Sequence, residues 1–452
     1  IASADPAERI AALSNAPHEL RDAVRSRSRD AEPGVRAAAL QRLAELSPGP
    51  ALDLPAIREA LADRDPRVRC AAASLLANGE GKESLDLLAA SLTDRSSEVR
   101  RAAESALAAR GDDAALAIEA YLRSESERTV CSALRVAAQL GAERSAELLR
   151  RELRACVHEL WYWVVAHEQL PVADSLASRF LRTACLDRVC RSRRIAFFVL
   201  ALIEDSSIVR NVARALQLGR ARQRGDALEI LSHLGERESA RLLVAYFEPA
   251  PLADRIQVAR RSVSVADDAR DWLAEARESS SRWIRMGARA IGLPPDHQPP
   301  ERQPLEDMLM ERLLALKEVP LFHNLSLDQL EAVHQIAKEV EFLPGEVILR
   351  EGDRGDELYL LLQGRVRIYK NHGLPDQVER PEQSAVSYFG EMAVLDDGIR
   401  TATVVAADRS LLLCLDGNSL RELLVQMPEI SLEMFRVLVD RVRVAEADMR
   451  AS

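Results

Sequence analysis

The sequence predicts a mainly α-helical protein: an α-α superhelical solenoid, followed by a small, jelly-roll-like β-barrel with flanking helices. Three observations lead to this prediction. A short segment recurs along the first part of the chain, with its valines at 35, 68, 99 and 130. Aromatic residues make up only 4% of the chain, whereas Ala, Leu and Arg, which favour helices, are abundant. After residue 321 the helical spacing gives way to short apolar runs between glycines, as in antiparallel strands.

The repeated unit is a turn followed by a helix that opens with Val-Arg. Asp30-Ala-Glu-Pro-Gly-Val-Arg recurs as Asp63-Arg-Asp-Pro-Arg-Val-Arg and as Asp94-Arg-Ser-Ser-Glu-Val-Arg. We expect the turn aspartate to accept backbone N–H groups at the start of the helix. The arginine is expected to reach the turn acid of a neighbouring repeat. Weaker copies follow at Thr129-Val130, Ile208-Val209-Arg210 and Trp283-Ile284-Arg285.

This pattern resembles HEAT repeats, in which helical hairpins stack into a curved solenoid. The resemblance is strong from about residue 20 to 145 and weaker from there to about 290. It implies a surface for a protein partner, because such solenoids expose extended binding faces. Trp161-Tyr162-Trp163 is expected to pack in the core or between repeats. The run from Arg188 to Arg194 is expected to be a solvated helix face, with lipid headgroups or an acidic partner as the alternative.

A proline-rich stretch divides the chain, because proline removes a backbone donor and restricts the residue before it. The predicted parts are a solenoid at 1–291, a linker at 292–304 and a second domain at 305–452. The second domain is expected to begin with a helix from Leu305 and to end with one over 429–450. The residues expected to pack these two helices together are Leu305, Met308, Leu309, Leu313 and Leu316 on the first, with Met434 and Leu438 on the second.

Short strands are predicted between these two helices. Residues 345–349, 357–362 and 365–369 are apolar or alternating runs, and Gly352, Gly355 and Gly364 separate them. Closely spaced strands with glycine turns favour a small antiparallel barrel.

A series of motifs runs through this region in order: Phe342-x-Pro-Gly-Glu-x-Ile348, Glu351-Gly-Asp353, Leu358-Tyr359, Phe389-Gly-Glu-Met-Ala-Val-Leu395 and Arg400-Thr-Ala-Thr-Val404. Together they resemble cyclic-nucleotide-binding domains, the modules of bacterial catabolite activators, protein kinase A regulatory subunits and cyclic-nucleotide-gated channels. The last two motifs match the phosphate-binding segment of that family.

The resemblance implies a ligand site formed by this segment. Gly390 would let the backbone approach the ligand, and Glu391 would accept the ribose 2′-hydroxyl. Arg400 would bind two phosphate oxygens through its planar guanidinium. The alternative is that Glu391 and Arg400 pair with each other in a vestigial pocket. The other expected site residues are Phe389, Met392 and Ala393, which open a short helix facing the phosphate, and Thr401 and Ala402.

The base of the ligand is expected to lie between a strand and the last helix. Ile368 would touch it from below, and Val442 and Glu446 would cover it. Thr401 is similar to the residue found in family members that accept cGMP as well as cAMP. The expected ligand is cAMP, and the resemblance at Thr401 leaves cGMP as the alternative.

Composition and motifs argue against other classes of function. A net charge of −10 disfavours a nucleic-acid-binding face. His167-Glu168 lacks the second histidine of a zinc-protease motif, and the chain has no phosphate-binding Gly-rich loop, so we expect no enzyme, metal site or cofactor.

The six cysteines form no C-x-x-C pair and are expected to be buried thiols in a reducing compartment. The apolar run 195–203 is too short to span a membrane.

These features together predict a cyclic-nucleotide sensor joined to a scaffold. The order of the parts resembles the cytosolic region of bacterial transporter-like proteins of the major facilitator or nucleotide translocase type. This resemblance implies a cytoplasmic location at the inner membrane, as part of a longer chain. The alternative is a free-standing soluble adaptor that binds a protein partner through the HEAT surface. The oligomeric state is left open.

Overall fold

The computed structural model describes residues 3–46, 53–170, 174–261, 271–291, 303–379, 382–384, 387–391, 398–428 and 430–439. They form two compact units, one of residues 1–169 with 188–270 and one of 170–187 with 271–452. The division therefore falls inside a long helix, and residues 271–291 group with the second unit. The predicted linker lies outside the described residues up to 302, so a separate domain from 305 onward stays a prediction.

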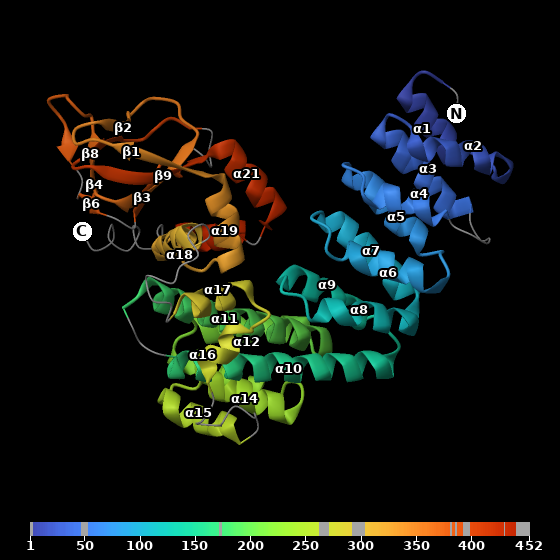
Figure 1. Ribbon diagram of the computed structural model, residues 1–452, viewed down its shortest axis with the longest axis horizontal. Coiled ribbons are helices and arrows are strands. Elements are labelled where there is room, and N and C mark those ends of the chain that lie inside the picture. The colour runs from blue at the N-terminus through green and yellow to red at the C-terminus, as the bar shows by residue number, and fades with distance from the viewer. Residues whose placement is uncertain are drawn as a thin grey trace. The chain divides into compact units, whose positions relative to one another are not determined.

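The first unit begins with short helices that follow one another in pairs (Figure 1). In succession, α3 packs on α5, α5 on α7 and α7 on α9. This arrangement confirms the predicted helical repeat. The helices are α1 (Pro6–Ser14), α2 (Arg21–Ser26), α3 (Pro33–Leu46), α4 (Leu54–Leu61), α5 (Pro66–Leu76), α6 (Gly81–Ser91), α7 (Ser97–Ala109), α8 (Ala114–Leu122) and α9 (Glu127–Ala137).

The repeat turns are held by caps and by arginines that cross between repeats. Asp65 is the N-cap of α5 and accepts the Arg67 N–H. The first aspartate of the turn, Asp63, accepts the N–H of Asp65 and both Nε and Nη2 of Arg36, at 2.8 and 3.0 Å. In the next repeat Arg69 donates to Asp94 at 2.7 and 2.9 Å. The predicted arginine-to-acid contact between repeats is thus confirmed, while the helix is capped by the third residue of the turn, Asp65.

Two long helices follow, α10 (Ala142–Gln169) and α11 (Leu176–Ile203), and α11 is divided between the two units. Shorter helices then complete the first unit: α12 (Ser206–Leu218), α13 (Ala221–Leu231), α14 (Arg237–Phe247) and α15 (Leu252–Arg260). Trp161 on α10 is fully buried, and its Nε1 donates to Leu242 O on α14 at 3.1 Å. The prediction that this aromatic cluster packs in the core is therefore confirmed.

The prediction that the arginine run on α11 is a solvated face is wrong. The side chains of Arg188 and Arg191 are only 12% exposed. Arg188 pairs with Glu125 and Glu159, and Arg191 donates to Ser124 O. The arginines hold α11 against α10 and the turn between α8 and α9, because acids of those segments lie opposite them.

The second unit contains α16 (Trp272–Arg277), α17 (Arg282–Ala290), α18 (Gln303–Glu318), α19 (Leu327–Ile336), α21 (Gly417–Gln426) and a helix over 430–439. On α18 the buried residues are Met310, Leu313 and Leu316. Leu305 and Met308 are 69% and 51% exposed, so the packed face starts further along the helix than predicted. Met434 is buried.

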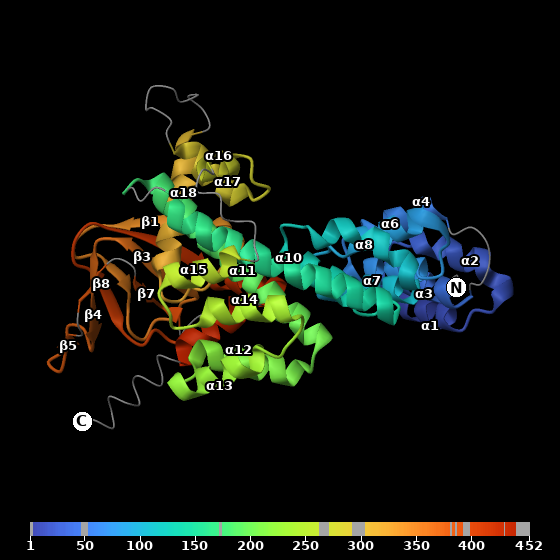
Figure 2. The ribbon, with the colours of Figure 1, turned by 90° about the horizontal axis from the view of Figure 1, so that it is seen from below.

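Two antiparallel sheets form the rest of this unit. One has the strand order β1-β9-β3-β7, and the other β2-β8-β4-β5, with β6 also paired to β4. Figure 2 shows β1, β3 and β7 in one layer and β8, β4 and β5 in the other. The strands are β1 (Ala337–Phe342), β2 (Val347–Leu349), β3 (Glu357–Gln363), β4 (Arg365–Lys370), β5 (Val378–Glu379), β6 (Gln383–Ser384), β7 (Ser387–Phe389), β8 (Thr403–Ala406) and β9 (Ser410–Asp416).

The described strands form two facing antiparallel sheets, which confirms the predicted small jelly-roll-like domain, and the two sheets do not close into a barrel. No strand joins β1 or β7 to the second sheet among the paired residues that the structure describes. Leu361, Phe389 and Leu412 from one sheet and Val366 and Val404 from the other share one apolar core. Alternating strand residues from two facing sheets account for this core.

Helix α17 lies against the start of α19 within this unit. Trp283 Nε1 donates to Asp328 Oδ1 at 2.8 Å, and Arg282 pairs with Glu331 at 2.9 Å. Leu327 N donates to Asp187 of α11 at 3.4 Å. The residue that marks the last weak repeat therefore contacts the helix that leads into the sheets.

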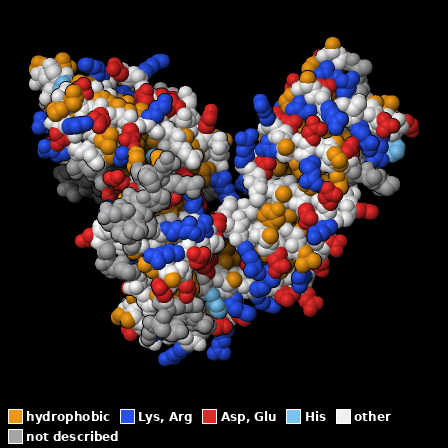
Figure 3. Space-filling model, in the orientation of Figure 1, with side chains coloured by type: hydrophobic (Ala, Val, Ile, Leu, Met, Phe, Trp, Pro, Cys, Tyr) orange, Lys and Arg blue, Asp and Glu red, His pale blue; other side chains and the backbone are white. Residues whose placement is uncertain are grey.

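Charged side chains of both signs are interspersed over the face seen in Figure 3. Among the described residues, no helix combines the length and the apolarity that crossing a membrane requires. The same residues contain no cluster of three or more His, Cys, Asp or Glu side chains that could hold a metal ion. The six cysteines are free thiols, and only Cys185 is fully buried.

Candidate functional site

Arg400 is fixed by a loop that precedes β3. Its backbone N–H donates to Asp353 O at 2.8 Å, and its carbonyl accepts from Gly352 N at 2.9 Å. Ile399 forms a β-bridge with Arg354. Next along the chain, Thr403 Oγ1 accepts the N–H of Glu351 at 3.0 Å. The backbone of Arg400 is therefore hydrogen-bonded to the loop that precedes β3, and this pairing fixes the position from which its side chain extends.

The guanidinium of Arg400 is buried, with 4% of the residue exposed. Nη1 donates to Glu357 O at 2.8 Å and to Gly390 O at 3.2 Å. Nη2 pairs with Glu357 Oε2 at 2.7 Å. The Glu357 side chain is 45% exposed, so one edge of the pair faces solvent. Backbone carbonyls thus orient the cation, while its charged partner is accessible.

Two glycines make room for this guanidinium. Gly390 has φ +88°, and a Cβ there would lie 2.7 Å from both Arg400 Nη1 and Glu357 O. A Cβ on Gly355 would lie 2.3 Å from Arg400 Nε. Gly390 is therefore required for its backbone conformation and for the close approach of Arg400. The sequence predicted the close approach but assigned it to the ligand.

Aromatic side chains support the site from the sheet behind it. Tyr359 on β3 stacks on Phe389 on β7, with ring centroids 5.7 Å apart and an interplanar angle of 14°. Burial, with a smaller contribution from Cys414, raises the pKa of Tyr359 to about 12. Phe389 itself is 5% exposed and belongs to the apolar core. Its side chain therefore supports the segment from beneath.

The remaining predicted residues are placed as follows. Glu391 is half-buried and directly follows Gly390. Thr401 is exposed and Ala402 half-buried, both next to Arg400. Ile368 lies on β4 opposite Val404 and packs against the core. The positions that lie outside the described residues are Met392, Ala393, Val442 and Glu446.

The sequence did not identify the partner of Arg400. The carboxylate that contacts it belongs to Glu357, which lies 43 positions earlier in the chain. Glu357 was noted only as the start of a strand. The only feature of the sequence that could have indicated Glu357 as the partner is that its carboxylate closely follows Gly355. Its neighbour Asp356 contacts Arg421 of α21 at 2.7 Å, so two adjacent acids serve different arginines.

Comparison with protein families gives two matches. Residues 339–427 match the cyclic nucleotide-binding domain, and residues 19–108 match HEAT repeats. The chain contains a cyclic nucleotide-binding domain joined to HEAT repeats. The first match includes the sheets and the Arg400 site, and the second includes the arginine–aspartate turns. Neither of the two matching models is that of an enzyme.

The relatives named here match less than a third of this chain. The cyclic AMP receptor protein of Thermus thermophilus is 28% identical over 134 residues, which are 30% of this chain and 62% of that protein. The regulatory subunit of cAMP-dependent protein kinase from Blastocladiella emersonii is 32% identical over 122 residues, 27% of this chain and 30% of that protein. Each relative therefore extends well beyond the matched region.

A solved structure covers the same region. It is the crystal structure of the catabolite activator protein of Thermus thermophilus, with 28% identity and a TM-score of 0.28. The match covers 29% of this chain and 62% of that one.

Proposed function

We propose that this protein senses a cyclic nucleotide, with cAMP as the preferred ligand, and passes the signal to a partner of its HEAT repeats. The observation that carries the proposal is the Arg400 guanidinium. It is buried, oriented by two backbone carbonyls and paired with a half-exposed carboxylate. A cyclic phosphate carries one negative charge and two free oxygens, which match the two N–H edges of a guanidinium.

In this proposal the phosphate displaces or shares the carboxylate of Glu357. The backbone carbonyls of Glu357 and Gly390 continue to hold Nη1, so the guanidinium needs little reorganisation when the ligand enters. A donor that is already oriented binds an anion better than one that must first be ordered. The half-exposed Glu357 side chain can turn toward solvent, because its carboxylate is not enclosed.

The other residues would read the rest of the ligand. Glu391 accepts the ribose 2′-hydroxyl, and Thr401 contributes a hydroxyl to the phosphate or to a guanine edge. Ile368 supports the base. Relatives named for cyclic AMP match over 134 and 122 residues, and a cGMP-dependent protein kinase of Drosophila melanogaster matches over 118, so we propose cAMP with cGMP as the alternative. The remaining proposed contacts are Phe389, Gly390, Met392, Ala393 and Ala402 near the phosphate and Val442 and Glu446 near the base.

We further propose that residues 305–452 are a regulatory domain and that the HEAT region binds the regulated protein. The order of the parts favours one candidate for the regulated protein, namely a transporter-like membrane region of the same polypeptide. The regulatory domain and the HEAT region would then lie at the cytoplasmic face of the inner membrane. Stacked repeats suit such a role, since they present a long continuous surface.

Isothermal titration calorimetry tests the ligand assignment. The chain is titrated with cAMP, cGMP, a cyclic dinucleotide and linear AMP as the control that lacks the phosphate ring. We expect one site for cAMP, weaker binding of cGMP, and little or no heat with the other two. Absence of binding by both cAMP and cGMP, in a sample with intact helical circular dichroism, would contradict the proposal.

A further inference from the structure

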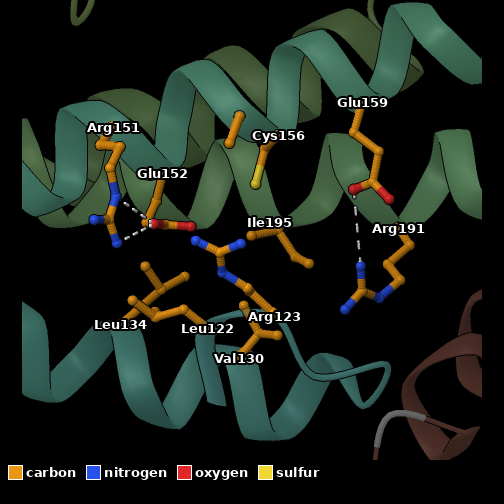
Figure 4. A pocket seen from close by; sticks show the side chains of 11 residues that line it. Leu122, Arg123, Val130, Leu134, Arg151, Glu152, Cys156, Glu159, Arg191 and Ile195 are labelled. Carbon is orange, nitrogen blue, oxygen red and sulfur yellow. Dashed lines mark hydrogen bonds and ion pairs between the residues drawn. The ribbon is translucent and has the colours of Figure 1, made fainter. Parts of the chain in front are cut away.

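A cavity of about 390 Å³ lies in the first unit, where the short repeat helices meet the long ones. It is bounded by the end of α8, by α9, by the middle of α10 and by α11 (Figure 4). α8 and α9 have 9 and 11 residues, whereas α10 and α11 each have 28. Helices of such different length do not continue the regular stacking of α3, α5, α7 and α9, and space remains between them. Its volume falls within the usual range of small-molecule sites, about 300–1,000 Å³.

Much of the interior of this cavity is apolar. Leu122, Val130, Leu134 and Ile195 line it, and all four are buried. Cys156 also faces it (Figure 4). Burial raises the pKa of the Cys156 thiol far above its ordinary range, so this side chain stays neutral. The body of a molecule that fills the cavity must therefore be apolar.

Positive charge is in excess around this interior, because three arginines and two glutamates line it. Arg151 is paired with Glu119 and Glu152. Arg191 donates to Ser124 O and lies 4.0 Å from Glu159.

Two donors in the cavity have no partner within the part of the chain that the structure describes. Arg191 Nε is buried without a hydrogen-bond acceptor. The Arg123 side chain is exposed and forms none of the ion pairs or hydrogen bonds found among the described residues. Figure 4 shows its side chain extending into the space between the two helix pairs. The Arg123 cation has no counter-charge among the described residues, and an anionic group at the opening of the cavity would supply one.

We propose that this cavity is a second ligand site, for a small organic anion with an apolar body and a single negative charge. Arg123 binds the anionic group at the opening, and the apolar side chains enclose the body. The site is independent of the cyclic nucleotide-binding domain, because all of its residues belong to the first unit.

Anilinonaphthalene sulfonate is a suitable probe, because it joins one sulfonate to an apolar aromatic body and fluoresces when enclosed. We expect Arg123→Gln to weaken its binding about ten-fold or more, since a hydrogen bond to a charged group is lost. Arg95→Gln is the matched control: Arg95 is an exposed arginine in an earlier repeat turn, and the affinity should not change. N-phenylnaphthylamine, the uncharged analogue, should bind both arginine variants alike.

A blocking variant locates the probe. Ala155 lines the cavity but is exposed, so Ala155→Phe should narrow the site without loss of folding and should abolish binding of both probes. Cyclic-nucleotide affinity should be the same in every variant. An unchanged sulfonate affinity in Arg123→Gln, or full binding of both probes by Ala155→Phe, would overturn the proposal.

Discussion

At the scale of the residue, the site depends on how Arg400 is shared between the protein and a ligand. Of the three hydrogen bonds described for its guanidinium, two are donated to backbone carbonyls, and these do not depend on the conformation of other side chains. The third is an ion pair with Glu357. An incoming phosphate must compete with that carboxylate, so Glu357 limits affinity in the proposed mechanism.

Glu357→Gln should therefore strengthen cAMP binding. The amide keeps the shape of the side chain and can still accept from Nη2, but it no longer offers a competing charge. A half-exposed ion pair is worth about 1 kcal/mol at most, so the gain should be up to about five-fold, measured by calorimetry. Glu341→Gln makes the same change of net charge at a surface pair with Arg409 and should leave the affinity unchanged. A large loss of affinity would instead show that Glu357 positions the arginine.

Thr401→Ala should cost more cGMP affinity than cAMP affinity. Thr401 is exposed beside the buried Arg400, where its hydroxyl can meet a guanine edge that adenine does not provide. A hydrogen bond of this kind contributes about 0.5–1.5 kcal/mol, so the cGMP loss should be about two- to ten-fold. Thr401→Ser keeps the hydroxyl and should restore both affinities. Equal losses for the two nucleotides would mean that Thr401 serves the phosphate alone.

Much of this site was predictable from sequence at the level of residue type but not of partner. Gly390 and Arg400 were expected because their segments resemble the phosphate-binding segment of cyclic-nucleotide-binding domains, and such motifs specify the type and order of residues. The pairing of Arg400 with Glu357 was not, because it joins the end of one loop to the start of a strand far away in the chain. The orientation of Phe389 into the core depends likewise on which sheet covers it.

At the scale of the element, the repeats are held by arginine–aspartate pairs that are largely removed from solvent. Burial alone would raise the pKa of Asp94. The hydrogen bonds from Arg69 and from the Ser96 N–H, together with the charge of Arg69, outweigh it and leave the pKa below its ordinary value of 3.8. The pair therefore stabilises the fold above the ordinary carboxyl pKa, and that stability is lost as the pH falls through the lower folded-state pKa.

Arg69→Met should destabilise the HEAT region at neutral pH by about 3–5 kcal/mol, because it leaves Asp94 partly buried without its partner. The cost should shrink as the pH falls below about 4, where protonation of the carboxyl removes the unpaired charge. Thermal unfolding followed by circular dichroism measures both effects. Arg58→Met is the control, since Arg58 pairs with Glu83 on the surface and should matter little. If both variants lost a similar amount of stability, the buried arginine–aspartate pairs would have no special role in holding the repeats together.

The turns and strands were predictable because their signals are local. Asp-x-Asp-Pro marks a capped turn, and glycines bound β2, β3 and β4. The arginines of α11 were misassigned because their acidic partners lie on other helices. Strand spacing predicted the small antiparallel, jelly-roll-like domain, but it does not decide whether the edges of the two sheets join.

At the scale of the whole molecule, the question is how occupancy of the site reaches the HEAT region. Residues 271–291 group with the second unit, and Trp283 of α17 donates to Asp328 of α19. This contact was not predicted as such, because α17 matched only the weakest copy of the repeat. It offers a route from the sheets, through α19, to the last helix of the repeat pattern.

We expect cAMP to change hydrogen exchange in α17, α18 and α19 together, in addition to residues 387–391 and 398–403. Trp283→Phe keeps an aromatic ring at this position but removes the indole N–H that donates to Asp328. In this variant the change in α17 should be lost, while the change around Arg400 persists, because the ligand site itself is intact. Couplings between sites are commonly about 1–3 kcal/mol. A response confined to the residues around Arg400 in the unchanged protein would mean that binding is not relayed.

The central claim, that Arg400 holds the phosphate of a cyclic nucleotide, is tested most directly by the cAMP affinity of Arg400→Ala, measured by titration calorimetry beside Arg365→Ala. Arg365 lies on β4, is largely exposed and pairs with Asp408 and Glu382, so its loss removes the same charge away from the proposed contact. We predict a loss of about 2–5 kcal/mol for Arg400→Ala, or tens- to thousands-fold in affinity, and little change for Arg365→Ala. A folded Arg400→Ala protein that binds cAMP as tightly as the unchanged chain would contradict the claim.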